Sequence, residues 1–457
     1  MFIKSSVHIM SATNPAQYEI ITLESNDQER TADLRLGAVS VDYYEDIFSP
    51  TITAKIRVIN TGDSMSPKDK TDSSKVDGSK QSIYGGLPLR GGERLILKIL
   101  DRGKSYNGED KKGINFSSDP MKYLYVSSIT DVIAETQRES FLLNFVSREA
   151  ITNETARVIR KYTGSISTSV KKILQETLKI DPLRIKVDPT SNKYNFIGNL
   201  KKPFSVLIWL ASKSVPSKSG DKTAGFLFYQ TQDGFQFRSI DDMIEQESVA
   251  TYVYTEVNKS SVDRNNDFRI IKYSVDKNQD LLKKLRLGTY SSQQLLFNPL
   301  NFRFTTPEQG KFKFQKSDVK KLGAREIELP KISDEAERTL DDLPTRIFTG
   351  ILDVGTLDRG ISRNVNADAS KYQAQSTMRY NVLLTQTISM LIPCNTDLRA
   401  GNVITCEFPK ISREDSSELD PDISGKYIIK ELCHHFDPEG SYTSMKIVRD
   451  SFGFYGG

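Results

Sequence analysis

Two stretches decide the fold of this chain: 387–410, TISMLIPCNTDLRAGNVITCEFPK, and 424–453, SGKYIIKELCHHFDPEGSYTSMKIVRDSFG. The first predicts a strand, a turn at 398–401 and a second strand through Cys406. The second predicts two strands joined by 437–440, Asp-Pro-Glu-Gly, a hairpin turn in which proline presets φ and glycine accepts a positive φ. Together the four strands predict half of a small antiparallel barrel, and they contain no recognisable active site.

The beginning of the chain has the pattern of another β-domain. Apolar and polar residues alternate through Ile52–Val58, which is the period of a half-buried strand. The segment Tyr43–Pro50 predicts a break between strands, and the polar segments 61–82 and 101–119 predict exposed loops. Further strands are expected at 93–100, 122–133 and 140–147. We therefore expect a first β-domain at 1–149.

The pattern changes near residue 150 to that of an α+β unit. Apolar residues at helical spacing predict one helix at 167–178 and another that begins after Pro203, with Phe204, Leu207, Ile208 and Ala211 on its buried face. The Asp233-Gly234 pair between two aromatic runs predicts a tight hairpin. These signals define a middle domain at 150–260.

The rest of the chain divides into a connecting region at 261–375 and a second β-domain at 376–457. The connecting region predicts a short helix at 279–287, strands and charged loops, including a polar segment at 354–371. It also has a basic run at 311–325 followed by an acidic run at 326–342. Loops whose charges pair with each other, or are solvated, explain these runs better than a nucleic-acid contact.

Composition limits the classes of function. The 457 residues include 63 basic and 59 acidic residues, a net charge of +4, which is too balanced for a dedicated nucleic-acid binder. The three cysteines indicate a reducing compartment rather than a disulfide framework. We find no signal peptide and no apolar run long enough for a membrane span, so we expect assembly in a cytoplasm and no membrane partner.

The search for catalytic or metal-binding chemistry gives mostly negative results. Cys433-His434-His435, with Cys394 and Cys406 upstream, suggests zinc by residue type. Neighbouring residues on a strand point to opposite faces, so Cys433 and His435 can share a face that His434 cannot. We therefore considered Cys433 and His435 as metal ligands and rejected them, with Cys433 as a core residue and the histidines as rim or partner contacts. No catalytic residue, cofactor or metal is expected.

Paired carboxylates and the single tryptophan are also explained structurally. Asp241-Asp242 and Asp341-Asp342 are expected on solvated faces rather than as the two carboxylates of a hydrolase. Trp209 lies among apolar residues of a predicted helix, so it is expected in the core rather than on a ligand platform.

Three groups of residues resemble the baseplate hub proteins of contractile-tailed, T-even-like phages, and a cyanophage source would fit them. These are Tyr43–Ile47 with 52–60, Ile151–Glu154 leading into the helix at 167–178, and 392–404 followed by 425–427 and the terminal hairpin. The related hub half of type VI secretion spike proteins shares the pattern. The family usually has glycine at position 394 and aspartate at 402, where this chain has Cys394 and Asn402, and these departures affect turn chemistry. The resemblance covers about two thirds of the chain and is weakest between 300 and 375.

The resemblance implies a mainly β fold in which two tail-tube-like antiparallel β-barrel domains bracket an α+β insert. It also implies a non-enzymatic virion protein of the phage tail baseplate. Three copies would form a pseudo-sixfold ring that joins the tail tube to the threefold central spike. The implied partners are the central spike protein, the tail tube protein, the baseplate wedge proteins and the tape-measure protein. DNA would only pass through the channel, and the polar segments at 61–82, 101–119 and 354–371 would face partners.

Two other classes of protein stay open from the sequence alone. A glycan hydrolase on a β scaffold would need two carboxylates at a working separation across a cleft. A receptor- or glycan-binding tail module would show exposed aromatic platforms and would not form a closed ring.

Overall fold

The computed structural model describes residues 15–60, 68–69, 82–87, 89–101, 112–217, 223–254, 267–299, 301–315, 319–325, 329, 331–333, 336–353, 369–410 and 419–453. The fold is mainly β with largely antiparallel sheets, which confirms the predicted fold class. Most of the predicted polar loops at 61–82 and 354–371, and 102–111 within the loop at 101–119, lie outside the described residues. Within the described ranges, no helix is both long enough and apolar enough to cross a bilayer.

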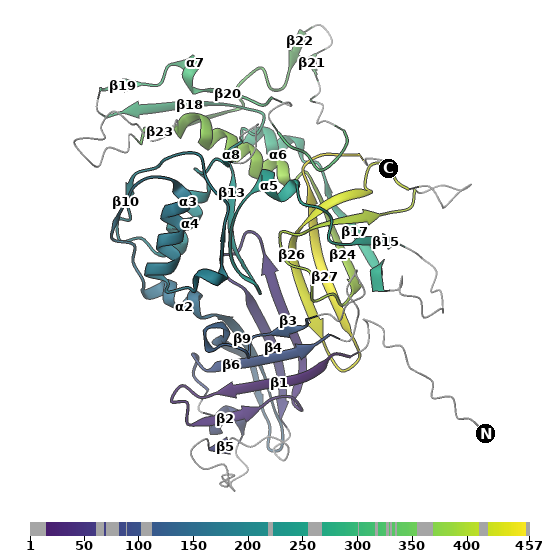
Figure 1. Ribbon diagram of the computed structural model, residues 1–457. Helices are drawn as coiled ribbons and strands as arrows, with labels where there is room; N and C mark the ends of the chain where they lie inside the picture. The colour runs from purple at the N-terminus through teal and green to yellow at the C-terminus, as the bar shows by residue number, and fades with distance from the viewer. Residues whose placement is uncertain are drawn as a thin grey trace.

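A first β unit packs around one apolar core at the purple end of the molecule (Figure 1). The alternation in β4 is confirmed, because Ala54, Ile56 and Val58 point into this core while Lys55 and Arg57 do not. The unit contains β1 (Gln17–Glu24), β2 (Arg30–Asp33), β3 (Ala38–Asp46), β4 (Thr53–Asn60), β5 (Lys68–Asp69), α1 (Ile83–Gly86), β6 (Arg94–Leu100), β7 (Ile114–Asn115), β8 (Leu124–Ala134) and β9 (Glu139–Ser147).

The predicted break at 43–50 is wrong in its first half. Strand β3 continues to Asp46, and only the following residues turn. The reason is a partner far along the chain: residues 41–46 pair with 431–436 of β26. Aromatic and acidic neighbours suggested a loop, but a strand paired on both edges can accept them.

The middle unit has its own core under two helices. Helix α4 begins with Pro203 at its first helical position, as predicted, but Ile208 is exposed and Leu210 takes its place on the buried face. The hairpin predicted at Asp233-Gly234 is confirmed, but its two turn residues are Gln232 and Asp233, and Gly234 begins β14 opposite Thr231. The elements are α2 (Arg148–Thr155), β10 (Lys161–Tyr162), α3 (Ile166–Lys172) with a π-helical turn at Ile173–Thr177, β11 (Ile185–Val187), β12 (Phe196–Ile197), α4 (Pro203–Ala211), β13 (Phe226–Thr231), β14 (Gly234–Ser239) and α5 (Ile240–Ile244).

A second β unit contains the four strands predicted from the opening stretches and encloses a third core. The terminal hairpin β26–β27 is confirmed, and β24 pairs with β27 while β25 pairs with β26. Among the described strands, one from the predicted middle region and two from the predicted connecting region complete it. The second β unit therefore takes strands from both sides of the predicted boundaries at 260 and 376. The strands are β15 (Thr251–Tyr254), β16 (Arg269–Ile270), β17 (Lys272–Asn278), β24 (Gln386–Pro393), β25 (Val403–Glu407), β26 (Gly425–Phe436) and β27 (Ser441–Arg449).

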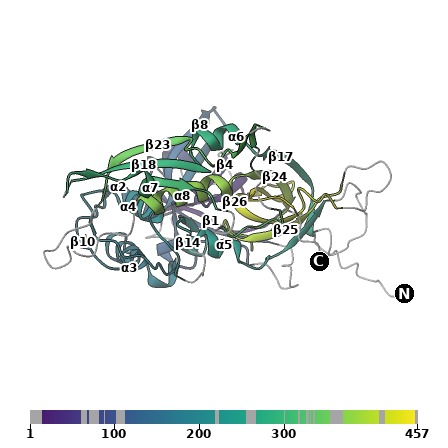
Figure 2. The same cartoon turned by 90° about the horizontal axis from the view of Figure 1, so that it is seen from above.

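Among the remaining elements, β18, β19, β20 and β23 form one sheet. We call this sheet, together with the helix α8 that lies along it, the arm (Figures 1 and 2). The second β-domain was expected to begin at 376, but residues 376–383 belong to the helix α8. The helix forms because Ala374, Met378 and Val382 recur every four residues and are buried on one face. The elements are α6 (Leu281–Arg286), β18 (Ser291–Asn298), β19 (Arg303–Phe304), α7 (Pro307–Gly310), β20 (Lys311–Lys313), β21 (Lys331–Ser333), β22 (Ala336–Thr339), β23 (Arg346–Ile351) and α8 (Ala369–Leu383).

One strand pairing joins the two β units. Strand β3 of the first unit pairs antiparallel with β26 of the second, and in the described part of the chain sixteen strands thereby belong to one sheet. Figure 1 shows the yellow strands β26 and β27 lying beside the purple strand β3. We call the paired residues 41–46 and 431–436 the seam.

Candidate functional site

The seam divides its side chains between two faces with the period of a strand. Val41, Tyr43 and Glu45 point inward from β3, and Leu432, His434 and Phe436 point inward from β26. Asp42, Tyr44, Asp46, Glu431, Cys433 and His435 form the outer face. The outer face is polar and accessible, so it is the part of the seam that can meet another molecule.

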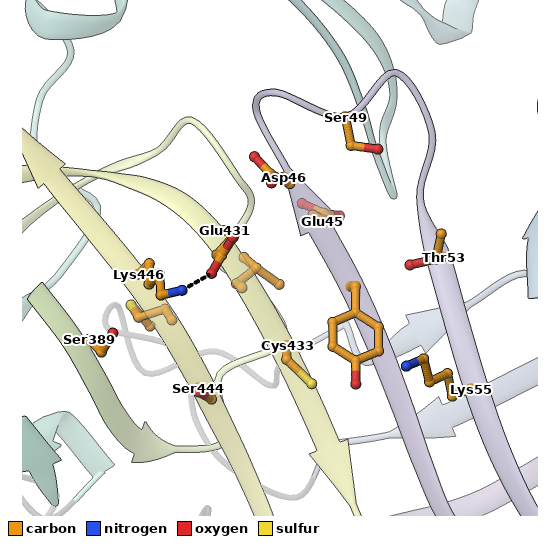
Figure 3. A pocket seen from close by; sticks show the side chains of 13 residues that line it. Glu45, Asp46, Ser49, Thr53, Lys55, Ser389, Glu431, Cys433, Ser444 and Lys446 are labelled. Atoms are coloured by element: carbon orange, nitrogen blue, oxygen red, sulfur yellow. Dashed lines mark ion pairs between the residues drawn. The ribbon is translucent and has the colours of Figure 1, made fainter. Parts of the chain in front are cut away.

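A pocket of about 570 Å³ lies on this outer face. Figure 3 shows side chains from β3 and β4 facing those of β26 and β27 across it, with Ser389 of β24 at one side. Its charges are mixed: Lys446 Nζ lies 3.0 Å from Glu431 Oε1, and Lys430 Nζ lies 3.4 Å from Asp46 Oδ2. This surface therefore has no concentrated positive field to hold a phosphate backbone.

Glu45 connects three parts of the molecule beneath the pocket. Its carboxylate accepts hydrogen bonds from Tyr43 Oη at 2.8 Å, from the backbone N–H of Gln232 at 2.7 Å and from that of Ala400 at 2.9 Å. These donors belong to β3, to the β13–β14 turn and to the connection between β24 and β25. Burial raises the pKa of Glu45, and nearby Arg399 opposes that rise. Sequence reasoning missed this role, because Glu45 lies in the run that was expected to be a break between strands.

The proposed sharing of a face by Cys433 and His435 is confirmed by their contacts. Asp42 Oδ1 lies 3.8 Å from Cys433 Sγ and 2.6 Å from His435 Nδ1. Cys433 is half-buried at the pocket rather than in a core, and His434 is buried against Thr443 and Tyr43 rather than at a rim. Both assignments are corrections: the period of β26 was right, but Cys433 was expected on the inner face and His434 on the outer one. His435, expected at a rim, does lie on the outer face.

The other two cysteines lie in different cores. Cys394 belongs to the core of the first β unit and Cys406 to that of the second. Across the described ranges, no three His, Cys, Asp or Glu side chains come together in a way that could hold a metal ion. Our rejection of a metal site at Cys433 and His435 stays a prediction.

A buried ionic cluster lies where α8, α5 and the segment after β27 meet. Arg379 of α8 lies 2.7 Å from Asp241 of α5 and 3.3 Å from Asp450, which follows β27, and all three side chains are 1% exposed. Thr223 also donates a hydrogen bond to Asp241. The expected solvated position of Asp241 is therefore wrong, and the residue is part of a structural ion pair.

The charged runs pair locally, as predicted, and also with other parts of the chain. Lys313 Nζ lies 2.6 Å from Asp342 and 3.4 Å from Asp341, and Arg325 lies 2.6 Å from Asp422. Trp209 is half-buried and packs edge-on against Tyr194 and Phe196, at the margin of the middle core.

The fold is similar to that of one solved tail protein. The chain aligns over 94% of its length with 96% of the tail protein from Neisseria meningitidis MC58, with a TM-score of 0.51 and 10% identity. It also aligns over 94% of its length with 98% of a 43 kDa tail protein of prophage MuSo2 from Shewanella oneidensis, with a TM-score of 0.49 and 8% identity. No known family model matches the chain.

A sequence relative gives a more specific likeness. The chain is 20% identical over 299 residues to the probable baseplate hub protein gp334 of Vibrio phage KVP40. The match covers 63% of this chain and 66% of that protein. The resemblance to phage baseplate hub proteins seen in the sequence is thereby confirmed.

Proposed function

We propose that this chain is a structural, non-enzymatic component of a phage tail baseplate, acting as its hub. The sequence likeness to a probable baseplate hub protein and the fold shared with a tail protein support this role. The observation that carries the proposal is the seam, because it makes two β units behave as one continuous sheet. An assembly part must transmit load between neighbours, and a sheet hydrogen-bonded across both units is suited to that.

In the proposed assembly, three copies place six β units in a pseudo-sixfold ring between the tail tube and the central spike. The outer face of the seam lines the channel, and its balanced charges let DNA and the tape-measure protein move through without strong binding. Baseplate wedge proteins contact the outside of the ring. The division at 1–149, 150–260, 261–375 and 376–457 is part of this proposal as an order along the sequence, with β15 and β17 contributing to the second β unit in space. Assembly in the host cytoplasm is also part of the proposal.

The arm supports a role in assembly because it buries polar side chains on one side and exposes large apolar ones on the other. Its inner side buries Ser292 and Gln294, and neither Ser292 Oγ nor Gln294 Oε1 has a hydrogen-bond partner among the described residues. Its other side leaves Phe302 80%, Ile351 73%, Phe304 66% and Ile347 63% exposed. Register and ring contacts place Phe302, Phe304 and Ile351 around Phe297. Ile347 pairs with Gln293, four residues away on the same face of β18, so the four side chains share one apolar face. Such a face is typical of a protein that is covered by a neighbour.

Replacing Phe302 and Phe304 together by serine is expected to weaken self-association by at least about 100-fold, since burial of each phenylalanine contributes about 1.5–3 kcal/mol. Light scattering should give the mass of three chains for the wild type and of one chain for Phe302→Ser/Phe304→Ser. Leu183→Ser is the matched control, because Leu183 is 93% exposed and lies outside the arm. A double variant that associates as the wild type does would remove the arm from the proposed contact.

A further inference from the structure

Both ends of the seam have a cation placed between two carboxylates. At one end, Lys430 Nζ lies 3.4 Å from Asp46 and 2.9 Å from Glu431. At the other end, His435 Nδ1 lies 2.6 Å from Asp42, and His435 Nε2 lies 3.0 Å from Asp437. In each case one carboxylate belongs to β3 and the cation to β26, so each group of three side chains fastens the two β units together.

Strand register explains why the Lys430 end needs its cation. Glu431 lies directly opposite Asp46, and two like charges in cross-strand positions repel each other. A register shift between Ile429 and Glu431 brings Lys430 onto the same face as both acids. Lys430 and Lys446 of β27, whose Nζ lies 3.0 Å from Glu431, therefore offset a repulsion that the pairing itself creates. Of these two lysines, Lys430 is the one that also contacts Asp46.

The His435 end has the same arrangement with a different cation. A neutral imidazole has one N–H and one bare acceptor nitrogen, whereas an imidazolium has two N–H donors. Because each ring nitrogen of His435 faces a carboxylate oxygen, only the imidazolium satisfies both contacts. Loss of one proton would leave a lone pair against a carboxylate.

The surroundings leave His435 as the group that changes charge here near neutral pH. Lys55 of β4 lies opposite Asp42 in register and is the lysine that faces this group from β4. Burial raises the pKa of Cys433 to about 12 and also raises the pKa of Tyr44 and of Tyr18, so these groups stay neutral. Tyr442 of β27 lies opposite His435 in register and is the phenol that faces it from that strand.

We propose that the seam is fastened by a permanent cation, Lys430, at one end and by a titratable cation, His435, at the other, so that it loosens from the His435 end as pH rises. This inference concerns the folded chain itself and does not depend on the proposed function. The junction between the two β units therefore opens first at its His435 end.

The electrostatics support the sign of the effect. Burial alone lowers the pKa of His435, but its hydrogen bonds to Asp42 and Asp437 and their charges outweigh burial and leave the pKa raised. Because the folded-state pKa of His435 is raised, its contacts with Asp42 and Asp437 contribute their full stability below the unfolded-state pKa of about 6.5. That stability is lost as pH rises through the folded-state pKa.

Amide hydrogen exchange of the full chain, followed by mass spectrometry, tests the proposal. The matched variant is His435→Lys, which keeps a cation at all relevant pH values. At about pH 9, wild-type amides at 41–43 and 434–436 should exchange roughly threefold faster than in His435→Lys, and at about pH 6 the two proteins should match. Comparing proteins at one pH cancels the intrinsic pH dependence of exchange.

Two further variants fix the direction. His435→Gln should show the faster exchange at both pH values, and Lys430→His should transfer the pH response to 45–46 and 431–432. Equal exchange in wild type and His435→Lys at both pH values would overturn the proposal. So would an acceleration spread evenly along the seam, or a Lys430→His variant whose pH response stays at the His435 end.

Discussion

Replacing Arg379 by methionine is expected to lower the free energy of unfolding by about 3–5 kcal/mol. Methionine keeps the apolar stem but leaves Asp241 and Asp450 buried without their counter-charge, and both are 1% exposed. Arg379 also donates to the backbone carbonyl of Lys320 at 2.8 Å, so the variant leaves a backbone acceptor unsatisfied as well. Because α8, α5 and the segment after β27 all meet at this guanidinium, their packing should loosen together. Urea unfolding followed by circular dichroism measures the difference.

Arg160→Met is the matched control for this prediction. Arg160 forms an ion pair with Glu176 at 2.6 Å, but both side chains are exposed. Pairs of this kind contribute at most about 1 kcal/mol, since water solvates either partner when the other is removed. Equal losses of stability in Arg379→Met and Arg160→Met would contradict the claim that loss of a buried ion pair costs more than loss of an exposed one.

Replacing Glu45 by alanine is expected to cost about 3 kcal/mol of folding stability, because buried donors that lose their acceptor each cost about 1–3 kcal/mol. The backbone N–H groups of Gln232 and Ala400 and the hydroxyl of Tyr43 would lose their shared acceptor. The measurement is chemical unfolding, combined with hydrogen exchange at 231–233 and 399–401. Both turns should exchange faster, since Glu45 is what holds them to β3.

Two comparisons make the Glu45 result specific. Glu45→Gln keeps a carbonyl acceptor of the same size and should recover part of the loss. Glu247→Ala removes a carboxylate that is almost fully exposed and should change stability little. If Glu45→Ala were no more destabilised than Glu247→Ala, the carboxylate would not connect the three parts.

Local patterns predicted the elements whose causes are local. The alternation at Ile52–Val58, the hairpin near Gly234 and the proline at the start of α4 each depend on neighbouring residues, and each was found, with the hairpin turn one residue earlier than predicted. Helix α8 escaped prediction because its buried residues Ala374, Met378 and Val382 are separated by polar ones, which gives a weak apolar stripe.

From the sequence, the site could be predicted only where the alternation of side chains along one strand decides the outcome. That rule placed Cys433 and His435 on one face, but their partner Asp42 lies 393 residues away from His435 in the chain. The buried Arg379–Asp241 pair spans 138 residues, and nothing near Asp241 marks it as buried. Contacts of this kind follow from how whole units pack, which one sequence does not encode in any local pattern.

Electron microscopy of the purified protein, alone and co-expressed with the central spike protein of its own phage, tests the central claim most directly. The account predicts particles of three copies in which six β units surround an open channel, with the spike seated on one side. A stable dimer, a fibre, or a chain that stays monomeric with the spike present would contradict it.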